Sequence, residues 1–387
     1  MLGSDMRSVP PNPGGSLPPD QILGRDSLID GYWSRLEHQS LALFSPRRVG
    51  KTSILRRMEH RAPVGWHVRH RDLEGLDSAH SFAQRLYEDA SALLPGGARA
   101  LARARALLER LTGSVELKNV TVTLADQNWR RLIESLFEDL DEEMGKRGER
   151  LVFLWDEFTL FIGDLTLRGS ERDAMVLLDT LRAARQQHLN VRMVLTGSIG
   201  FHLVMRQLDA KGYRNRPIND VRVERVPMFE AEDARPVVAA LLRGIDVEPE
   251  AEVVETIIRQ SEGHPFVIQH LVESLQATRK PTADDVASSL TRLLAPPSVL
   301  DLGHYATRLS KYYAEREAPA LAVLDLLARE PEGVDVDDLF VQVPHERELL
   351  RTTIQDLRDD DYVVRRGRSL RFSLDFVRRH WCEDRML

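Results

Sequence analysis

Eight residues from Ser45 to Thr52 have the types and the spacing of a loop that binds phosphate. They read Ser-Pro-Arg-Arg-Val-Gly-Lys-Thr and fit the pattern G-x-x-x-x-G-K-[ST], except that serine stands where the first glycine is expected. In such a loop the backbone N–H groups point at one spot, as does the positive end of the following helix. The residues expected to bind phosphate are Pro46, Arg47, Arg48, Val49, Gly50, Lys51, Thr52 and Ser53.

Within this loop, two side chains would do the chemistry. Lys51 would add a positive charge for the outer phosphates, and the Thr52 hydroxyl would ligate Mg²⁺. Ser45 weakens the match slightly, because glycine tolerates a positive φ freely and serine adopts one only at a cost.

Two adjacent carboxylates, Asp156 and Glu157, complete the pattern. They follow the apolar run from Leu151 to Trp155, which is typical of a fully buried parallel strand. The carboxylates would emerge at the carboxyl edge of the sheet, where open α/β sheets place ligands. Asp156 would hold Mg²⁺ through water, and Glu157 would polarise the attacking water as general base.

Polar residues after the next two expected strands have more than one reading. Thr196 and Ser198 follow a buried strand, and either would suit sensing of the γ-phosphate or positioning of the water, but the segment would equally cap the next helix. Arg214 and Arg216 precede the last expected strand. They are candidates for arginine fingers that reach a neighbouring subunit, although solvated surface charges explain them as well.

The elements that must position these residues alternate between strand and helix, which predicts a parallel sheet with helices packed on it. The expected strands are 41–44, 65–73, 151–155, 190–196 and 219–226. The Arg- and Ala-rich stretch at about 96–126 interrupts this alternation, and we interpret it as an insertion on the core.

From residue 230 the pattern becomes helical, which indicates a small lid. Within it, Gly263-His264-Pro265 starts a helix. Pro265 either caps this helix or lies against a nucleotide base. The tail reads as three helices and a hairpin with a basic tip, the order of a winged helix that would suit DNA phosphates. However, residues 318–387 hold 11 Lys/Arg and 15 Asp/Glu, which favours packing on the ATPase itself or on a protein partner.

Length, net charge and cysteine content limit the domain number, the partners and the cellular setting that we expect. A chain of 387 residues predicts two or three domains, and a formal charge of −7 argues against broad affinity for nucleic acid or acidic membranes. Cys382 is the single cysteine, which excludes an intrachain disulfide and favours a cytoplasmic setting. The sequence has neither a signal-peptide pattern nor an apolar run of membrane-spanning length. The first 20 residues, rich in Pro, Gly and Ser, predict a disordered leader.

Four motifs together resemble the AAA-like ATPases of bacteria and archaea, relatives of the STAND signalling ATPases and, more distantly, of origin-recognition initiators. They are P-R-R-x-G-K-T-S in the loop, W-D-E-F, T-G-S and G-H-P-F. The resemblance covers roughly Ile22 to Ala277 and implies ATP with Mg²⁺. It implies that Leu23, Gly24 and Arg25 border the adenine and that Pro265 contacts the base. The phosphates and Mg²⁺ would be held by Gly50, Lys51, Thr52 and Ser53. The resemblance further implies that Asp156 and Glu157 carry out hydrolysis and that Ser198 is the sensor.

We therefore expect an α/β P-loop NTPase of the ASCE, AAA-like class with a parallel sheet core. The expected parts are a disordered leader (1–20), the core (21–228), a helical lid (229–300) and a winged-helix domain (301–387). The expected function is a Mg²⁺-dependent ATPase switch that couples the bound nucleotide, ATP or ADP, to the winged helix and to a protein partner or a second copy. Two alternatives remain open: an ATP-dependent, initiator-like DNA-binding protein, and a nucleotide-bound scaffold without turnover.

Overall fold

The computed structural model describes residues 7–93, 101, 103–104, 121–198, 200–295 and 298–387. They form two compact units. The first, here called the sheet unit, comprises Asp26–Phe44 and Lys51–Val226. The second, the helical unit, comprises the chain up to Arg25, the loop Ser45–Gly50 and Pro227–Leu387.

Five strands make the sheet of the sheet unit, and every neighbouring pair in it is parallel. They lie in the order β2-β3-β4-β1-β5. Their bounds are Leu41–Phe44 (β1), Trp66–Asp72 (β2), Arg150–Asp156 (β3), Val191–Gly197 (β4) and Arg222–Glu224 (β5). The parallel sheet predicted from the alternation of strands and helices is confirmed.

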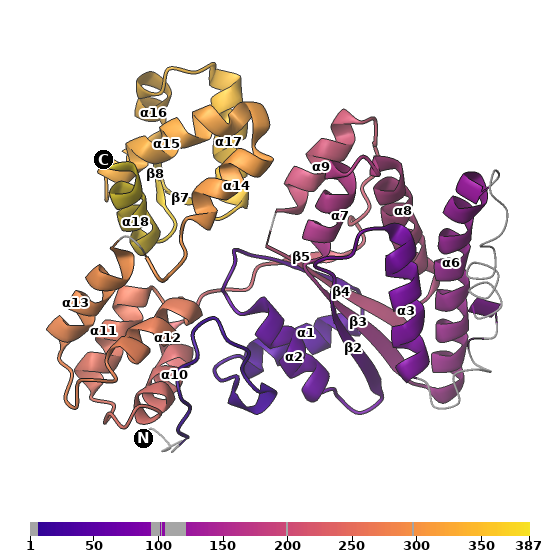
Figure 1. The fold of residues 1–387 in the computed structure, drawn as a ribbon, viewed down its shortest axis with the longest axis horizontal. Coiled ribbons are helices and arrows are strands. Elements are labelled where there is room, and N and C mark those ends of the chain that lie inside the picture. Colours follow the sequence, from indigo (N-terminus) through magenta and orange to yellow (C-terminus); the bar gives the residue numbers. More distant parts are fainter. Residues whose placement is uncertain (1–6, 94–100, 102, 105–120, 199, 296–297) are drawn as a thin grey trace. The chain divides into compact units, whose positions relative to one another are not determined.

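Helices cover both faces of this sheet (Figure 1). One face carries α1 (Asp26–Leu36) and α2 (Lys51–His60). The other carries α3 (Ala79–Leu93), α6 (Thr121–Arg147), α7 (Phe158–Leu167) and α8 (Glu171–Gln187), with α9 (Phe201–Ala210) packed on α7.

Alternation along β3 assigns each of its side chains to one face. Phe153 and Trp155 belong to the large apolar core under α3 and α6, where the Trp155 ring lies 5.1 Å from Phe82. Because successive side chains of a strand point to opposite faces, Leu154 and Asp156 point toward α1 and α2. The carboxylate at the end of β3 therefore lies on the face that carries the helix following the loop.

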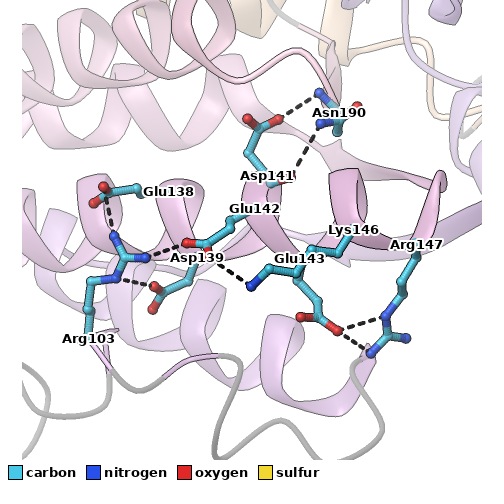
Figure 2. Close-up of polar contacts among 9 residues, drawn as sticks. All are labelled: Arg103, Glu138, Asp139, Asp141, Glu142, Glu143, Lys146, Arg147 and Asn190. Atoms are coloured by element: carbon cyan, nitrogen blue, oxygen red, sulfur yellow. Dashed lines mark hydrogen bonds and ion pairs between the residues drawn. The ribbon is translucent and has the colours of Figure 1, made fainter.

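Helix α6 begins earlier than the sequence suggested. Thr121 and the residues after it, which we had placed in the insertion, form its first turns; the rest of the expected insertion, apart from residues 101, 103 and 104, lies outside the described residues. Arg103 is fastened to α6 by ion pairs with Glu138 (2.7 Å), Asp139 (2.8 Å) and Glu142 (2.6 Å) (Figure 2). Burial raises the pKa of Asp139.

The helical unit contains two groups of elements. The lid helices are α10 (Ala231–Arg243), α11 (Ala251–Ser261), α12 (Pro265–Ser274) and α13 (Ala283–Leu294). The C-terminal group is α14 (His304–Tyr312), α15 (Glu317–Arg329), β6 (Val334–Asp335), α16 (Val336–Gln342), α17 (Arg347–Asp359), β7 (Val363–Arg366), β8 (Ser369–Phe372) and α18 (Asp375–Arg385). Its order from α15 to β8 contains the three helices and the antiparallel hairpin that the sequence predicted.

One lid side chain holds the start of α18. Glu262, at the end of α11 with a φ of +50°, accepts hydrogen bonds from the backbone N–H groups of Asp375 (2.6 Å) and Phe376 (3.4 Å). Burial raises the pKa of Glu262. The neighbouring His264 ring packs edge-on against Phe376 at 5.4 Å. The lid and the C-terminal group are therefore joined by capping as well as by apolar contact.

The N-terminal segment differs from the disorder that its composition predicted. From residue 7 it lies against the lid helices: the N–H of Val9 donates to the carbonyl of Ala240 (3.0 Å), and the N–H of Asn12 donates to Gln269 Oε1 (2.8 Å). Val9 is buried. A Cβ at Gly244 would lie 2.1 Å from the Val9 carbonyl oxygen, so glycine is what allows this close approach. A short 3-10 turn, Pro19–Gln21, follows.

None of the helices within the described residues combines the length and the apolar character that crossing a membrane requires.

Candidate functional site

The end of the phosphate loop starts a helix, as the sequence predicted. Helix α2 begins at Lys51, directly after Gly50 and the β1 strand that precedes the loop. The first N–H groups of a helix have no partner within it, and they form its positive end. Lys51, Thr52 and Ser53 therefore present backbone donors where an anion would bind. Lys51 is buried.

The carboxylate of Asp156, at the end of β3, accepts several hydrogen bonds. Its Oδ2 accepts from Thr52 Oγ1 at 2.5 Å. Its Oδ1 accepts a short hydrogen bond from the Thr196 hydroxyl and a further one from the Glu157 N–H at 3.2 Å. His70 Nε2 lies 3.9 Å from Oδ2. The two metal-ligand candidates, Thr52 and Asp156, are thus in direct contact although 104 positions separate them in the sequence.

The environment of Asp156 keeps its carboxyl ionised. Burial by itself would raise its pKa, but the nearby His70 imidazole and the hydrogen bonds from Thr196 and Thr52 outweigh burial and lower the pKa to about 2. A buried carboxylate beside a threonine hydroxyl is a hard oxygen donor set of the kind that Mg²⁺ prefers. The residues present therefore fit the metal that the loop implies.

Protein side chains alone would not complete a metal shell here. Within the described part of the chain, no three or more His, Cys, Asp or Glu side chains are grouped in a way that could hold a metal ion. A Mg²⁺ ion at Thr52 and Asp156 would complete its shell with phosphate oxygens and water, which is how Mg²⁺ is commonly bound with nucleotides.

Glu157 is held by the residue that we expected to be the sensor. It adopts a φ of +52° just before α7, a backbone conformation that is costly for a non-glycine residue and is concentrated at functional sites. Its Oε2 accepts hydrogen bonds from the Ser198 hydroxyl (2.8 Å) and the Ser198 N–H (3.1 Å). Thr196 and Ser198, which the sequence left as alternatives, therefore have separate partners: Thr196 contacts Asp156, and Ser198 contacts Glu157.

The first part of the loop carries its unusual backbone at Arg48, not at Ser45. Among the described residues, Arg48 (φ +67°) and Gly50 (φ +94°) have positive φ in this loop. The predicted conformational cost of Ser45 is therefore wrong. The Arg48 guanidinium pairs with Asp301 at 2.8 Å, and its carbon lies 4.1 Å from the centre of the Phe266 ring.

Two of the three residues expected at the adenine, Gly24 and Arg25, lie close to a second aromatic ring, that of Phe229. The guanidinium carbon of Arg25 lies 4.0 Å from the centre of the Phe229 ring, and its Nη2 donates to the carbonyl of Val49 at 3.4 Å. Gly24 packs so closely that an added Cβ would lie 2.9 Å from the Phe229 ring. Arg25 thus joins the loop to the lid. Contact of Leu23, Gly24 and Arg25 with a base stays a prediction.

Pro265 occupies the first position of α12, which agrees with its reading as a capping residue. It directly precedes Phe266, the ring on which Arg48 lies. A contact between Pro265 and a base stays a prediction.

Arg214 and Arg216, the two candidate arginine fingers, are neighbours in sequence of residues whose side chains are hydrogen-bonded to α8. The Tyr213 hydroxyl and the Asn215 amide both donate to Asp179 of α8, at 2.8 Å and 3.0 Å. Arg214 and Arg216 alternate with these anchored residues and are exposed. The structure therefore places both arginines on the surface of the sheet unit, next to side chains that are hydrogen-bonded to α8.

Sequence reasoning missed His70. The residue lies in the predicted strand 65–73, two positions before Asp72, and β2 pairs with β3 so that Asp72 stands opposite Asp156. The available signal was a polar side chain near the carboxyl end of a strand. Nothing in the sequence identified β3 as the neighbour of β2.

A solved structure with the same architecture is the Walker-type ATPase of Pyrococcus abyssi. It matches 96% of this chain and 98% of its own, with a TM-score of 0.64 and 16% sequence identity. The two proteins therefore have the same fold. At this identity the likeness concerns the fold alone. Less similar structures include the ORC2 protein of Aeropyrum pernix (TM-score 0.49, 12% identity, 98% of this chain and 96% of that one) and the RuvB motor of Thermotoga maritima (TM-score 0.37, 12% identity, 90% and 91%).

No protein-family model matches the sequence, and no curated protein matches it significantly.

Proposed function

We propose that this chain binds ATP with Mg²⁺ and hydrolyses it to ADP and phosphate. The observation that carries the proposal is the 2.5 Å hydrogen bond between Thr52, at the start of the loop helix, and Asp156, at the end of the acidic strand. A P-loop fold with this contact has its metal-binding hydroxyl and its metal-binding carboxylate together. Glu157, the residue after Asp156, supplies a carboxylate for the water.

Each residue has a distinct task in this reaction. The N–H groups that open α2 and the Lys51 ammonium bind the phosphates. Thr52 and Asp156 hold Mg²⁺, which when bound neutralises charge on the phosphate oxygens. Glu157 accepts a proton from the attacking water, whose oxygen forms a bond to the γ-phosphorus as the bond to the β–γ bridging oxygen breaks. Ser198 orients the Glu157 carboxylate through two hydrogen bonds.

The reaction would serve as a conformational switch. Loop residues Ser45–Gly50 belong to the same compact unit as the lid and the C-terminal group. Arg48 of this loop pairs with Asp301, close to the start of α14. Phosphates that draw Arg48 away from Asp301 would therefore bias the helical unit according to whether ATP or ADP is bound.

The partner in this switch would be a protein or a second copy of the chain. A second copy would place Arg214 or Arg216 at the nucleotide of its neighbour. DNA is less favoured, because the charges of the C-terminal hairpin are partly used within the fold: Arg368 pairs with Asp335 (3.1 Å) and Asp337 (2.5 Å).

The decisive experiment replaces Glu157 by Gln. Steady-state phosphate release from ATP should fall by about 10²- to 10⁴-fold, the usual contribution of a general base. Binding of fluorescent ATP should change less than about threefold, because Lys51, Thr52 and Asp156 are intact. Glu134→Gln, on the exposed face of α6, is the matched control and should keep wild-type turnover.

Two results would contradict the proposal. Unchanged phosphate release in Glu157→Gln would show that Glu157 is not the base. A wild-type protein that binds ATP without releasing phosphate would be a nucleotide-bound scaffold instead.

A further inference from the structure

His70 has a buried nitrogen with no hydrogen-bond partner among the described residues. Its side chain is 12% exposed, and Nε2 is buried and unpartnered. A buried polar atom without a partner costs about 1–3 kcal/mol. Such atoms are few in native structures, and each calls for an explanation, a missing water or ion among them.

The sheet brings this nitrogen to the metal-site candidates. In the parallel register of β2 and β3, His70 stands opposite Leu154 and Asp72 stands opposite Asp156. Side chains two positions apart on a strand share a face. His70 therefore points to the same face as Asp156, the face that carries α2 and Thr52. The backbone N–H of His70 also donates to Glu59 Oε1 of α2 at 2.9 Å, which ties β2 to this helix.

The separation of the two groups suits one bridging water. His70 Nε2 and Asp156 Oδ2 are 3.9 Å apart, which is too long for a direct hydrogen bond. An oxygen atom about 2.8 Å from each would fit between them with an angle near 90° at that oxygen. Direct binding of one metal ion by both atoms is less suitable, because bonds of about 2.1 Å would then enclose an angle of roughly 135°, far from the octahedral geometry that Mg²⁺ demands.

We propose that His70 is a positioning residue of the Mg²⁺ site: its imidazole and the Asp156 carboxylate together hold one water ligand of the ion. The inference rests on the proposed function, since it assumes that nucleotide and Mg²⁺ bind at Lys51 and Thr52. Groups that orient the ligands of a metal in this way are commonly worth 10- to 100-fold in metal affinity.

The test measures the metal dependence of nucleotide binding in the full chain, apart from turnover. Fluorescent ADP is titrated in EDTA and, at a fixed protein concentration, with increasing Mg²⁺. In His70→Ala the Mg²⁺ concentration at half-effect should rise about 10- to 100-fold, whereas ADP affinity in EDTA should stay within about twofold of wild type. His70→Gln, which keeps a polar group of similar reach, should recover part of the loss.

The matched control is His67→Ala on the same strand. His67 pairs with Glu149 at 2.6 Å, away from Asp156, and its loss should leave the Mg²⁺ dependence unchanged. A purely structural role for His70 would lower ADP affinity equally with and without Mg²⁺, and that result would overturn the inference.

The outcomes separate this inference from the proposed function. A wild-type protein that binds ADP more tightly with Mg²⁺, together with His70→Ala and His70→Gln variants of unchanged Mg²⁺ dependence, overturns the role of His70 alone. A wild-type protein that binds no nucleotide in either condition overturns the proposed function, and the role of His70 with it.

Discussion

Thr196→Val is the substitution that most directly tests how the carboxylate of Asp156 is held. Thr196 is fully buried; its hydroxyl donates to Asp156 and accepts from the Glu157 N–H at 3.2 Å. Valine keeps the shape and removes both bonds. A hydrogen bond to a charged group contributes about 1.5–3 kcal/mol, so the unfolding free energy of the ligand-free protein should fall by about 2–3 kcal/mol.

The depressed pKa of Asp156 reflects how strongly all of its surroundings together favour the ionised carboxylate. Its value of about 2, against a reference of 3.8, corresponds to roughly 2.5 kcal/mol of net stabilisation at about 1.4 kcal/mol per unit. Because the folded pKa is depressed, this stability is present above pH 4 and is lost as the pH falls toward 2. The difference in unfolding free energy between wild type and Thr196→Val should therefore be constant from pH 8 to 5 and should narrow only below about pH 4.

The assay is urea denaturation of the ligand-free protein, with Ser198→Ala as the control. Ser198 contacts the partly exposed Glu157, where water can replace the lost hydroxyl, so its loss should cost less than about 1 kcal/mol. A cost below about 0.5 kcal/mol for Thr196→Val, or equal costs for the two variants, would refute the view that Asp156 is the buried charge that these donors stabilise.

Two further predictions concern the helical unit. Asp301→Ala removes the partner of Arg48 from a half-exposed ion pair, so stability should change by less than about 1 kcal/mol, but release of fluorescent ADP in stopped flow should change severalfold; an unchanged rate would contradict the proposed switch. Burial, with the nearby charges of His304, Arg48 and Arg25, lowers the pKa of His264 to about 3. His264 is therefore neutral when folded and charged when unfolded below about pH 6.5, which should remove about 2 kcal/mol of stability between pH 8 and 5. In His264→Phe the unfolding free energy should fall less between pH 8 and 5 than in wild type, as measured by urea denaturation at both pH values. An equal fall in the two proteins would contradict the role of His264 in this pH dependence.

The start of a helix after the loop and the end of the strand at Asp156 could be predicted because both signals are local. A G-K-T sequence after an apolar run requires only neighbouring residues to define a strand, a turn and a helix start. The same holds for the apolar residues before Asp156 and Glu157. The assumption about Ser45 failed for a local reason as well: the loop takes its positive φ at Arg48, and the pattern does not say which residue does so.

Partners across the sheet could not be predicted, because they depend on strand order and register. Thr196 and Ser198 looked equivalent in sequence, and only the pairing of β3 with β4 gives each its own carboxylate. His70 needed the register of β2 on β3. The N-terminal segment likewise depended on a distant feature, the absence of a side chain at Gly244, which composition cannot reveal.

The two carboxylates of the site are held in different ways, and the difference fits their proposed tasks. Asp156 is 2% exposed and is contacted from α2, from β4 and from the following N–H, with His70 of β2 nearby. Such a carboxylate is preorganised, and a metal ion would bind it without rearrangement. Glu157 is partly exposed and is held by Ser198 alone among the described side chains that hydrogen-bond its carboxylate. The Glu157 carboxylate therefore has fewer hydrogen-bond partners than that of Asp156, which fits a proposed base that must reach the attacking water, whereas the proposed metal ligand is preorganised.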